Sequence, residues 1–261
     1  MRGMDQRTED GSAGDADYGA IGSAYSRYRR PDPRIAAVIA DALGESRTVL
    51  NVGAGTGSYE PQGREVTAVE PSAAMRAQRP EHLPRAVDAT AEQLPFADGD
   101  FDAAMATFSV HQWKDPAAGL REMRRVTRGP VVVLTCDPRR VEEFWLAEYA
   151  PEILAAEARR YPALEDLAAG LGGRVSTSTV LIPQGCTDGF TEAYYGRPES
   201  LLDAEAQLAC SAWNLVEPAV IDRFTRHLAA HLLDGTWDAA HGALRTRPRY
   251  EGSLVLLVSQ P

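Results

Sequence analysis

The sequence predicts an α/β protein built around a mainly parallel sheet. Short apolar runs typical of buried strands alternate with alanine-rich, helix-favouring stretches along the first half of the chain. Strands that are separated by helices pair in parallel through right-handed crossovers. A chain of 261 residues, 44% of them hydrophobic, is long enough to bury the core that such a sheet needs.

Six runs are predicted as strands and three stretches around the first four strands as helices. The strands are Thr48–Val52, Glu65–Glu70, Phe101–Ala106, Pro130–Cys136, Arg174–Ile182 and Ser253–Ser259. The helices are Arg34–Leu43, Ser72–Gln78 and Ala117–Val126. About 70 residues rich in aromatic side chains separate the last two strands, more than a hairpin connection requires. We therefore expect a mostly helical cap there.

Charge and composition narrow the classes of partner. The chain has 37 acidic and 27 basic residues, a net charge of -10, whereas nucleic-acid binding requires a basic face. No apolar run approaches the roughly 18 to 20 residues of a membrane span. The first 17 residues lack the apolar stretch of a signal peptide, and the three cysteines have no Cys-x-x-Cys spacing. We expect a cytoplasmic protein that binds neither nucleic acid nor membrane; its oligomeric state is not indicated.

A glycine-rich turn follows the first predicted strand. Gly53, Gly55 and Gly57 alternate directly after Val52. Glycine lets the backbone turn sharply and lets a ligand approach the chain closely. The same spacing fits a plain strand-to-helix turn or a dinucleotide fingerprint, but Ser58 stands where that fingerprint requires its third glycine.

The second predicted strand ends in an acid. Glu70 lies at the carboxyl edge of the sheet, where a carboxylate can accept both hydroxyls of a ribose. The alternative is an acidic helix cap at Glu70 or Ser72. A third motif, Asp88 to Phe96, then leads into the strand that begins at Phe101.

Together these segments resemble the Rossmann-type, class I S-adenosylmethionine-dependent methyltransferases, in particular those acting on small molecules. The matching pieces are Val49–Gly57, Val66–Met75, Asp88–Phe101 and Glu122–Val133. The resemblance implies S-adenosylmethionine as cofactor and a Rossmann-like, mostly parallel seven-stranded sheet with a helical cap. We expect a leader and amino-terminal cap segment at 1–30, the cofactor-binding core at 31–138, and cap insertions with the last two strands at 139–261.

The resemblance also implies roles for individual residues. In that family the glycine loop lies against the methionine part of the cofactor, the second-strand acid binds the ribose, and an Asp before an Ala-x-x-Leu-Pro-Phe stretch hydrogen-bonds the adenine. Cofactor binding is thereby assigned to Asn51, Gly53, Ala54, Gly55, Gly57, Glu70, Pro71, Met75, Asp88, Ala89 and Thr107. The family usually has Asp at the position of Asn51, and the amide loses a negative charge that would face a cationic cofactor.

Catalytic and substrate residues are predicted from the loop after the fourth strand and from the cap. His111 would face the transferred methyl group, and a histidine with a pKa near about 6.5 can take a proton at neutral pH. Alternatively, His111 hydrogen-bonds a loop or caps the next helix. The substrate candidates are Tyr25, Arg29, Trp113, Tyr195, Trp213, Trp237 and His241. No metal is expected, because His227 and His231 lack a third ligand.

The predicted function is methylation of a small, partly apolar metabolite at oxygen, nitrogen or carbon, in specialised metabolism. One alternative is a protein that binds S-adenosylmethionine without transferring its methyl group, as a sensor or as a repurposed catalyst. A nicotinamide-dependent reductase is a further alternative, which the glycine spacing opposes.

Overall fold

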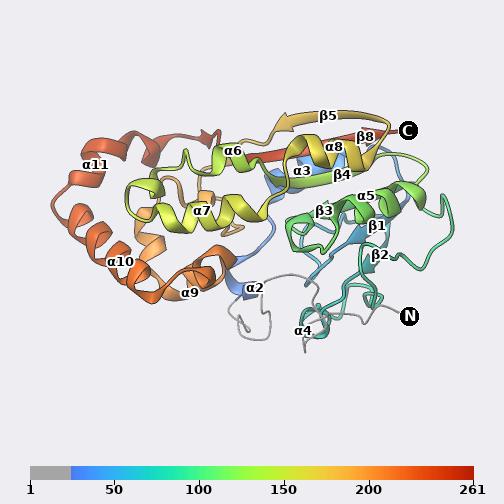
Figure 1. Ribbon diagram of the computed structural model, residues 1–261, viewed down its shortest axis with the longest axis horizontal. Helices are drawn as coiled ribbons and strands as arrows, with labels where there is room; N and C mark the ends of the chain where they lie inside the picture. The colour runs from blue at the N-terminus through green and yellow to red at the C-terminus, as the bar shows by residue number, and fades with distance from the viewer. Residues whose placement is uncertain (1–24) are drawn as a thin grey trace.

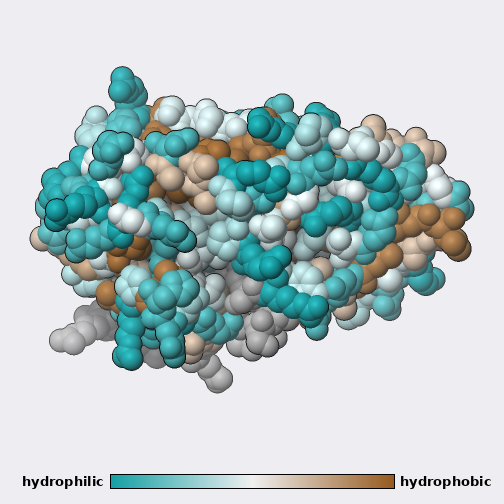
Figure 2. All heavy atoms as spheres, turned by 180° about the vertical axis from the view of Figure 1, so that it is seen from behind, coloured by the Kyte–Doolittle hydropathy of each residue, from teal (hydrophilic) through white to brown (hydrophobic). Residues whose placement is uncertain are grey.

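The computed structural model describes residues 25–261. A twisted sheet forms one half of the molecule, and a group of helices extends from it to form the other half (Figure 1). Figure 2 shows a face that is largely hydrophilic, with an apolar area at the end formed by α10 and α11. Leu233, the last residue of α10, is 91% exposed. Within the described residues, no helix has both the length and the apolar character that crossing a membrane requires.

The main sheet has six strands in the order β2-β1-β3-β4-β8-β5. Their bounds are β1 (Thr48–Val52), β2 (Glu65–Val69), β3 (Ala103–Thr107), β4 (Val131–Cys136), β5 (Arg174–Thr179) and β8 (Leu254–Gln260). The first four pair in parallel, and β8 runs antiparallel to both β4 and β5. The α/β class and the mainly parallel sheet are thus confirmed.

The predicted count of seven strands is corrected to six in the part of the chain that the structure describes. Beside β2, where a further strand would lie, Val87 makes a single parallel bridge to Val69. The approach to this bridge carries Pro80 and Pro84, which have no amide hydrogen to donate to a sheet. One residue is paired where a full strand was expected.

Apolar side chains cover both faces of the sheet. Successive residues of β4 point to opposite faces, so Val132 and Val133 belong to different apolar clusters. On one face, α3 adds Ile35 to the first cluster, and on the other, α5 and α8 add Leu120 and Leu167 to the second. Buried on both sides, β4 is the most apolar of the parallel strands, as its β-branched sequence predicts.

The helices of the sheet half are α3 (Pro33–Ala42), α4 (Ala73–Ala77), α5 (Pro116–Arg125) and α8 (Leu164–Leu171). Both α3 and α5 begin with an Asp–Pro pair. The carboxylates of Asp32 and Asp115 accept hydrogen bonds from backbone amides of the first turn, and the following proline needs no acceptor. The predicted helix ranges agree with α3, α4 and α5 to within one or two residues.

The other half, which we call the helical region, comprises residues 138–161 and 191–246. Its α-helices are α6 (Pro138–Val141), α7 (Pro151–Arg160), α9 (Ala204–Leu208), α10 (Pro218–Leu233) and α11 (Thr236–His241). Its 3₁₀-helices are η3 (Trp145–Glu148), η4 (Thr191–Tyr194), η5 (Pro198–Leu202), η6 (Ser211–Leu215) and η7 (Gly242–Thr246). Two further helices are α2 (Tyr25–Tyr28) and η2 (Val110–Gln112).

A small second sheet joins the helical region to the main sheet. It pairs β6 (Ile182–Pro183) with β7 (Arg249–Tyr250) in antiparallel fashion. The predicted strand Arg174–Ile182 is therefore two strands, because the chain leaves β8 after Val180 and Ile182 pairs with Tyr250 instead.

Candidate active site

The glycine loop adopts a conformation that requires glycine. Gly53, Gly55 and Gly57 have φ values of 68°, 51° and 97°, in the region that other residues rarely adopt. A Cβ on Gly53 would lie 2.6 Å from the Cβ of Ser109, and one on Gly55 would lie 3.2 Å from Cε of Met75. The loop therefore packs closely against the segments that follow β3 and β2.

Glu70 joins the glycine loop to the start of α4. One carboxylate oxygen accepts a hydrogen bond from the amide of Gly55 and the other from the amide of Ser72, each at 2.8 Å. Burial raises the pKa of Glu70, whereas these two hydrogen bonds act in the opposite direction. A carboxylate has about four lone-pair positions, so two amides leave acceptor capacity for a ligand.

A cavity opens at the carboxyl ends of β1, β2 and β3. Open α/β sheets bind their ligands at this edge. The predicted cofactor and substrate residues that line this cavity are Gly53, Ala54, Gly55, Glu70, Pro71, Met75, Thr107, Arg29 and Trp113. We call it the first cavity.

Asn51 does not line the first cavity. It is fully buried in β1, and its amide nitrogen donates to Oε1 of Glu60 at 3.1 Å. The Glu60 carboxylate also forms a buried ion pair with Arg79 at 2.8 Å. Asn51 therefore holds an ion pair behind the glycine loop instead of facing a ligand.

Asp88, Ala89 and Gly57 also lie outside the lining of the first cavity. The half-exposed carboxylate of Asp88 pairs with Arg76 at 3.1 Å, and Ala89 is buried in the sheet core. Thr90, Ala91 and Glu92 line the cavity in their place. A Cβ on Gly57 would meet Leu83, and this glycine borders a separate surface groove.

One wall of the first cavity is a polar cluster that the sequence did not indicate. The Arg29 guanidinium pairs with Asp188 at 2.5 Å, and both side chains are largely buried. The Tyr59 hydroxyl donates to the other oxygen of Asp188 at 2.9 Å. The Arg29 guanidinium also lies 5.2 Å from the ring centre of Phe108, whose φ of 50° is unusual for a non-glycine residue.

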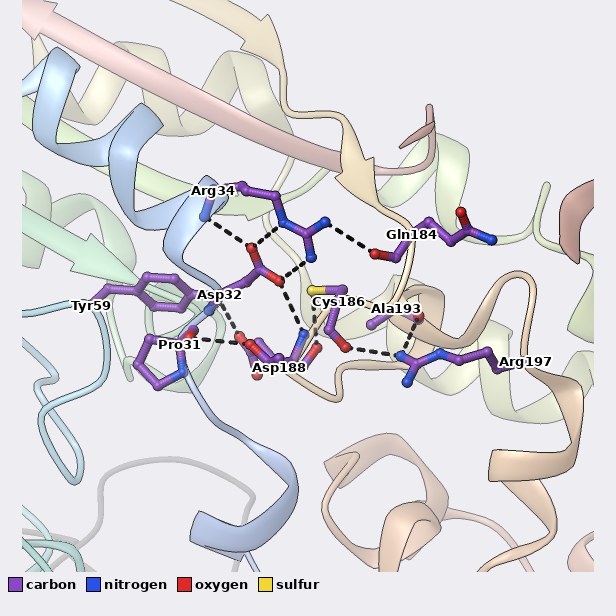
Figure 3. A network of polar contacts seen from close by, with 10 residues as sticks. Pro31, Asp32, Arg34, Tyr59, Gln184, Cys186, Asp188, Ala193 and Arg197 are labelled. Atoms are coloured by element: carbon purple, nitrogen blue, oxygen red, sulfur yellow. Dashed lines mark hydrogen bonds and ion pairs between the residues drawn. The ribbon is translucent and has the colours of Figure 1, made fainter. Parts of the chain in front are cut away.

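A hydrogen-bond network fixes this wall to the rest of the chain (Figure 3). The fully buried Asp32 accepts from the Arg34 side chain at 2.7 Å and from the amide of Thr187 at 3.1 Å. Although burial alone raises the pKa of Asp32, these hydrogen bonds bring it down to about 2. The segment before α3 is thereby held against the segment that carries Asp188.

His111 lines a second, smaller cavity and not the first. Its ring packs 4.8 Å from the ring of Tyr161. Burial lowers the pKa of His111 well below its usual value, and the positive charges of Arg160 and Arg29 act in the same direction. His111 is therefore neutral at pH 7.

The remaining substrate candidates lie away from both cavities. Tyr195 stacks on Tyr250 at 5.0 Å between ring centres, and Trp213 and Trp237 are fully buried in the core of the helical region. These aromatic side chains supply packing, because the helical region needs a core of its own. His241 contacts Glu148 at 3.1 Å on the far side of that core.

The last two expectations concern Tyr25 and metal binding. Tyr25 begins α2, but its side chain lies outside the described part of the structure. Among the residues described, no group of three or more His, Cys, Asp and Glu side chains is arranged to hold a metal ion.

Several residues at the two cavities were not predicted from the sequence. Phe108 and Tyr59 are adjacent to predicted motifs, and a search of the motif flanks would have found them. Glu157 and Asp188 carry no local signal, because long-range packing brings them to the site, Glu157 from the helical region and Asp188 from the segment between β6 and η4. The unpredicted lining residues include Tyr59, Phe108, Glu157, Tyr161, Asp188, Phe190, Thr191, Cys210 and Ser211.

Comparison with known proteins places the central part of the chain in a family. Residues 50–133 match the family model described as a methyltransferase domain. A demethylmenaquinone methyltransferase from Renibacterium salmoninarum is 39% identical over 108 residues, covering 37% of this chain and 45% of the relative. A malonyl-[acyl-carrier protein] O-methyltransferase from Pseudescherichia vulneris is 33% identical over 129 residues, covering 46% and 51%. The chain thus matches about half the length of these curated relatives.

Solved structures extend the likeness to nearly the whole chain. A putative methyltransferase from an antibiotic biosynthesis pathway of Anabaena variabilis is 29% identical, with a TM-score of 0.83 over 90% of this chain and 100% of the other. A possible histamine N-methyltransferase from Thermotoga maritima, 18% identical with a TM-score of 0.51 and 93% coverage of both chains, shares the fold.

Proposed function

Because the chain belongs to the Rossmann-type, class I S-adenosylmethionine-dependent methyltransferases, we propose that it transfers the methyl group of that cofactor to a small molecule. The observation that carries the proposal is the unit formed by the glycine loop and Glu70 at the edge of the first cavity. This unit fits the cofactor, because it offers a close backbone approach beside a carboxylate with acceptor capacity. When bound, S-adenosylmethionine supplies an electrophilic methyl group on a sulfonium.

The residues of the first cavity have distinct proposed roles. Glu70 accepts the ribose hydroxyls, Met75 packs on the adenine, and the loop from Gly53 to Gly55 lies against the methionine part. Thr107 and Trp113 complete the side of the cavity that faces β3. These residues bind and orient, which is the main requirement of an in-line displacement.

His111 is the proposed general base. A neutral imidazole can accept a proton from the methyl acceptor, and His111 lines the second cavity, which shares Arg29 and Phe108 with the first. Residues 31–138 would then form the cofactor-binding core, and 139–261 would supply the cap insertions that hold the acceptor, together with the last two strands of the sheet.

The acceptor is proposed to be a small, partly apolar metabolite of specialised metabolism, in the cytoplasm. The similarity to a structure from an antibiotic biosynthesis pathway supports the type of metabolism. The relatives named for demethylmenaquinone and for malonyl-[acyl-carrier protein] support methyl transfer to metabolites, although each covers only part of this chain.

Calorimetric titration with S-adenosylmethionine, S-adenosylhomocysteine and NADH tests the cofactor assignment. We expect the first two to bind, and Glu70→Ala to weaken that binding by about 1.5 to 3 kcal/mol, the scale of hydrogen bonds to a charged group. Glu65→Ala, at the exposed start of the same strand, is the matched control and should bind normally. Unchanged affinity in a folded Glu70→Ala protein would contradict the ribose assignment, and NADH binding alone would favour the reductase alternative.

A further inference from the structure

Gly55 is held in the glycine loop through both of its backbone polar groups. Its amide donates to Oε2 of Glu70 at 2.8 Å, and its carbonyl oxygen accepts from Nη1 of Arg79 at 3.3 Å. Glu70 lines the first cavity, whereas Arg79, which lies just after α4, does not. One of the two hydrogen bonds therefore comes from the site itself and the other from outside it.

The Arg79 side chain is held in place by an ion pair that is almost fully buried. Its Nη2 donates to both oxygens of Glu60, at 2.8 and 3.0 Å, and the two side chains are 4% and 2% exposed. The same nitrogen donates to the carbonyl oxygen of Pro84 at 3.0 Å. Hydrogen bonds between charged groups are strong and directional, so the guanidinium that reaches the Gly55 carbonyl has a fixed position.

Asn51 connects the ion pair to the strand that precedes the glycine loop. Its amide nitrogen donates to Oε1 of Glu60 at 3.1 Å, and β1 ends at Val52, directly before the loop. An aspartate at position 51 would place a second buried carboxylate against Glu60, and such like charges repel each other. The neutral amide therefore suits this arrangement. We call Asn51, Glu60 and Arg79 the loop brace.

The third glycine of the loop leaves room for the loop brace. A Cβ on Gly57 would lie 2.3 Å from Cδ1 of Leu83 and 3.2 Å from Nη1 of Arg79. This Nη1 is the atom that donates to the Gly55 carbonyl. The absence of a side chain at Gly57 therefore lets Arg79 reach the part of the loop that lines the first cavity.

We propose that Arg79 is a positioning residue for the cofactor, which acts through the Gly55 carbonyl. Glu60 and Asn51 hold it in place. The inference rests on the proposed function, in which the loop from Gly53 to Gly55 lies against the methionine part of S-adenosylmethionine. A binding segment that is already ordered costs less free energy to fix when the ligand arrives. The methionine part should therefore depend on Arg79 more than the adenosine part does.

Two ligands distinguish these parts of the cofactor. S-adenosylhomocysteine carries the amino-acid group, and 5′-methylthioadenosine lacks it. In calorimetric titrations of the full chain, Arg79→Met should raise the dissociation constant of the first by about tenfold and that of the second by less than about threefold. The matched control is Arg64→Met, because Arg64 also donates to two backbone carbonyls, of Ser46 and Ala40 at 3.1 Å each, away from the loop. It should bind both ligands as the wild type does.

A double variant separates the position of the loop from the stability of the fold. Arg79→Met leaves the buried Glu60 carboxylate without its charged partner, which should destabilise the protein. Glu60→Gln combined with Arg79→Met removes both charges and keeps an acceptor for Asn51. We expect its melting temperature to be closer to that of the wild type, with the loss of S-adenosylhomocysteine affinity retained. If Arg79→Met alone does not fold, the double variant provides the comparison.

Hydrogen exchange of the ligand-free chain tests the same role without a ligand. The peptide that contains Gly53 to Gly57 should exchange faster in both Arg79 variants than in the wild type or in Arg64→Met. Equal losses for the two ligands, affinity that recovers in the double variant, or unchanged exchange of this peptide would overturn the proposal. Failure of S-adenosylhomocysteine to bind the wild-type chain would instead count against the proposed function, because the exchange rates still decide whether Arg79 holds the loop.

Discussion

Among the residues that the structure describes, burial raises the pKa of three glutamates, Glu70, Glu157 and Glu192. The first two line the cavities, whereas Glu192 lies in η4, where its carboxylate accepts hydrogen bonds from the Ser253 amide and hydroxyl, the latter at 2.7 Å. Burial raises the pKa of Glu192 to about 7, although the bonds from Ser253 act against this. The same physical effect thus acts on two glutamates that line cavities and on a third that holds segments of the chain together.

Glu192 should make the stability of the protein depend on pH. Between pH 4.5, the ordinary pKa of a glutamate, and about pH 7, the folded state keeps a proton that the unfolded state has released, so stability falls as pH rises through this range. The contribution is about 3 kcal/mol. Denaturant unfolding at several pH values should show that decline in the wild type and a flatter profile in Glu192→Gln. Glu217→Gln, an exposed glutamate, should follow the wild-type profile, and a decline that persists in Glu192→Gln would contradict the assignment.

At the scale of single residues, the sequence predicted those that belong to local motifs. The glycine loop, Glu70, Pro71 and Met75 lie together because a strand, a turn and a helix start place them. Asp88 was assigned to the adenine through the family motif, but in the structure Arg76 holds its carboxylate outside the cavity. The motif itself does not indicate such a partner, because the partner comes from a neighbouring helix.

The turn from α8 into β5 contains two adjacent glycines with positive φ, Gly172 at 62° and Gly173 at 66°. A Cβ on Gly172 would meet no atom within 4 Å, whereas one on Gly173 would lie 2.2 Å from the carbonyl oxygen of Gln260. Gly173 therefore lets the edge strand β5 approach β8, with which it pairs from Arg174 onward.

Alanine substitutions at these two glycines distinguish the cost of backbone strain from the cost of a steric clash. Gly172→Ala should cost about 1 to 3 kcal/mol, the range for a residue held in a sparsely populated conformation. Gly173→Ala carries the same strain and must also displace β5 from β8, so it should cost clearly more. Urea unfolding of both variants makes the comparison, and equal losses would show that the Gln260 contact does not govern this turn.

Elements with a strong local pattern were predicted well, and those set by long-range packing were not. β1, β2 and β4 are apolar runs whose burial follows from composition. The division of the predicted strand 174–182 depends on Tyr250, a partner almost 70 residues away, which pairs with Ile182. The helices of the helical region have short amphipathic patterns, but their arrangement follows from contacts among themselves.

On the scale of the whole molecule, Asp32 joins two distant parts of the chain. It caps α3, binds the Arg34 side chain and accepts from the amide of Thr187, more than 150 residues away. Asp115 also caps a helix, α5, but it is exposed, and its carboxylate accepts one hydrogen bond, from the amide of Ala118 at 2.9 Å. The two aspartates therefore share the N-cap role and differ in burial and in their further contacts.

Replacing each of them by alanine should measure the value of those contacts. Asp115→Ala should lose about 1 kcal/mol, the usual cost of an N-cap. Asp32→Ala should lose at least about 2 kcal/mol more, because buried donors are left without an acceptor. Because the pKa of Asp32 is lowered to about 2, its contribution is present above pH 3.8 and lost as the pH falls toward that value. Thermal and urea unfolding provide the measurement, and similar losses in both variants would contradict the role of the Thr187 contact.

The pairing of Arg29 with Asp188 also has a consequence during synthesis. A ribosome that has released residues as far as β4 has already delivered the glycine loop, Glu70 and Met75, yet the cavity still lacks the wall that Asp188 completes. Affinity for a ligand scales with the fraction of molecules in which the binding-competent form is assembled. We therefore expect the cofactor to bind with full affinity, and to stabilise the fold, only after the segment that carries Asp188 has packed against Arg29.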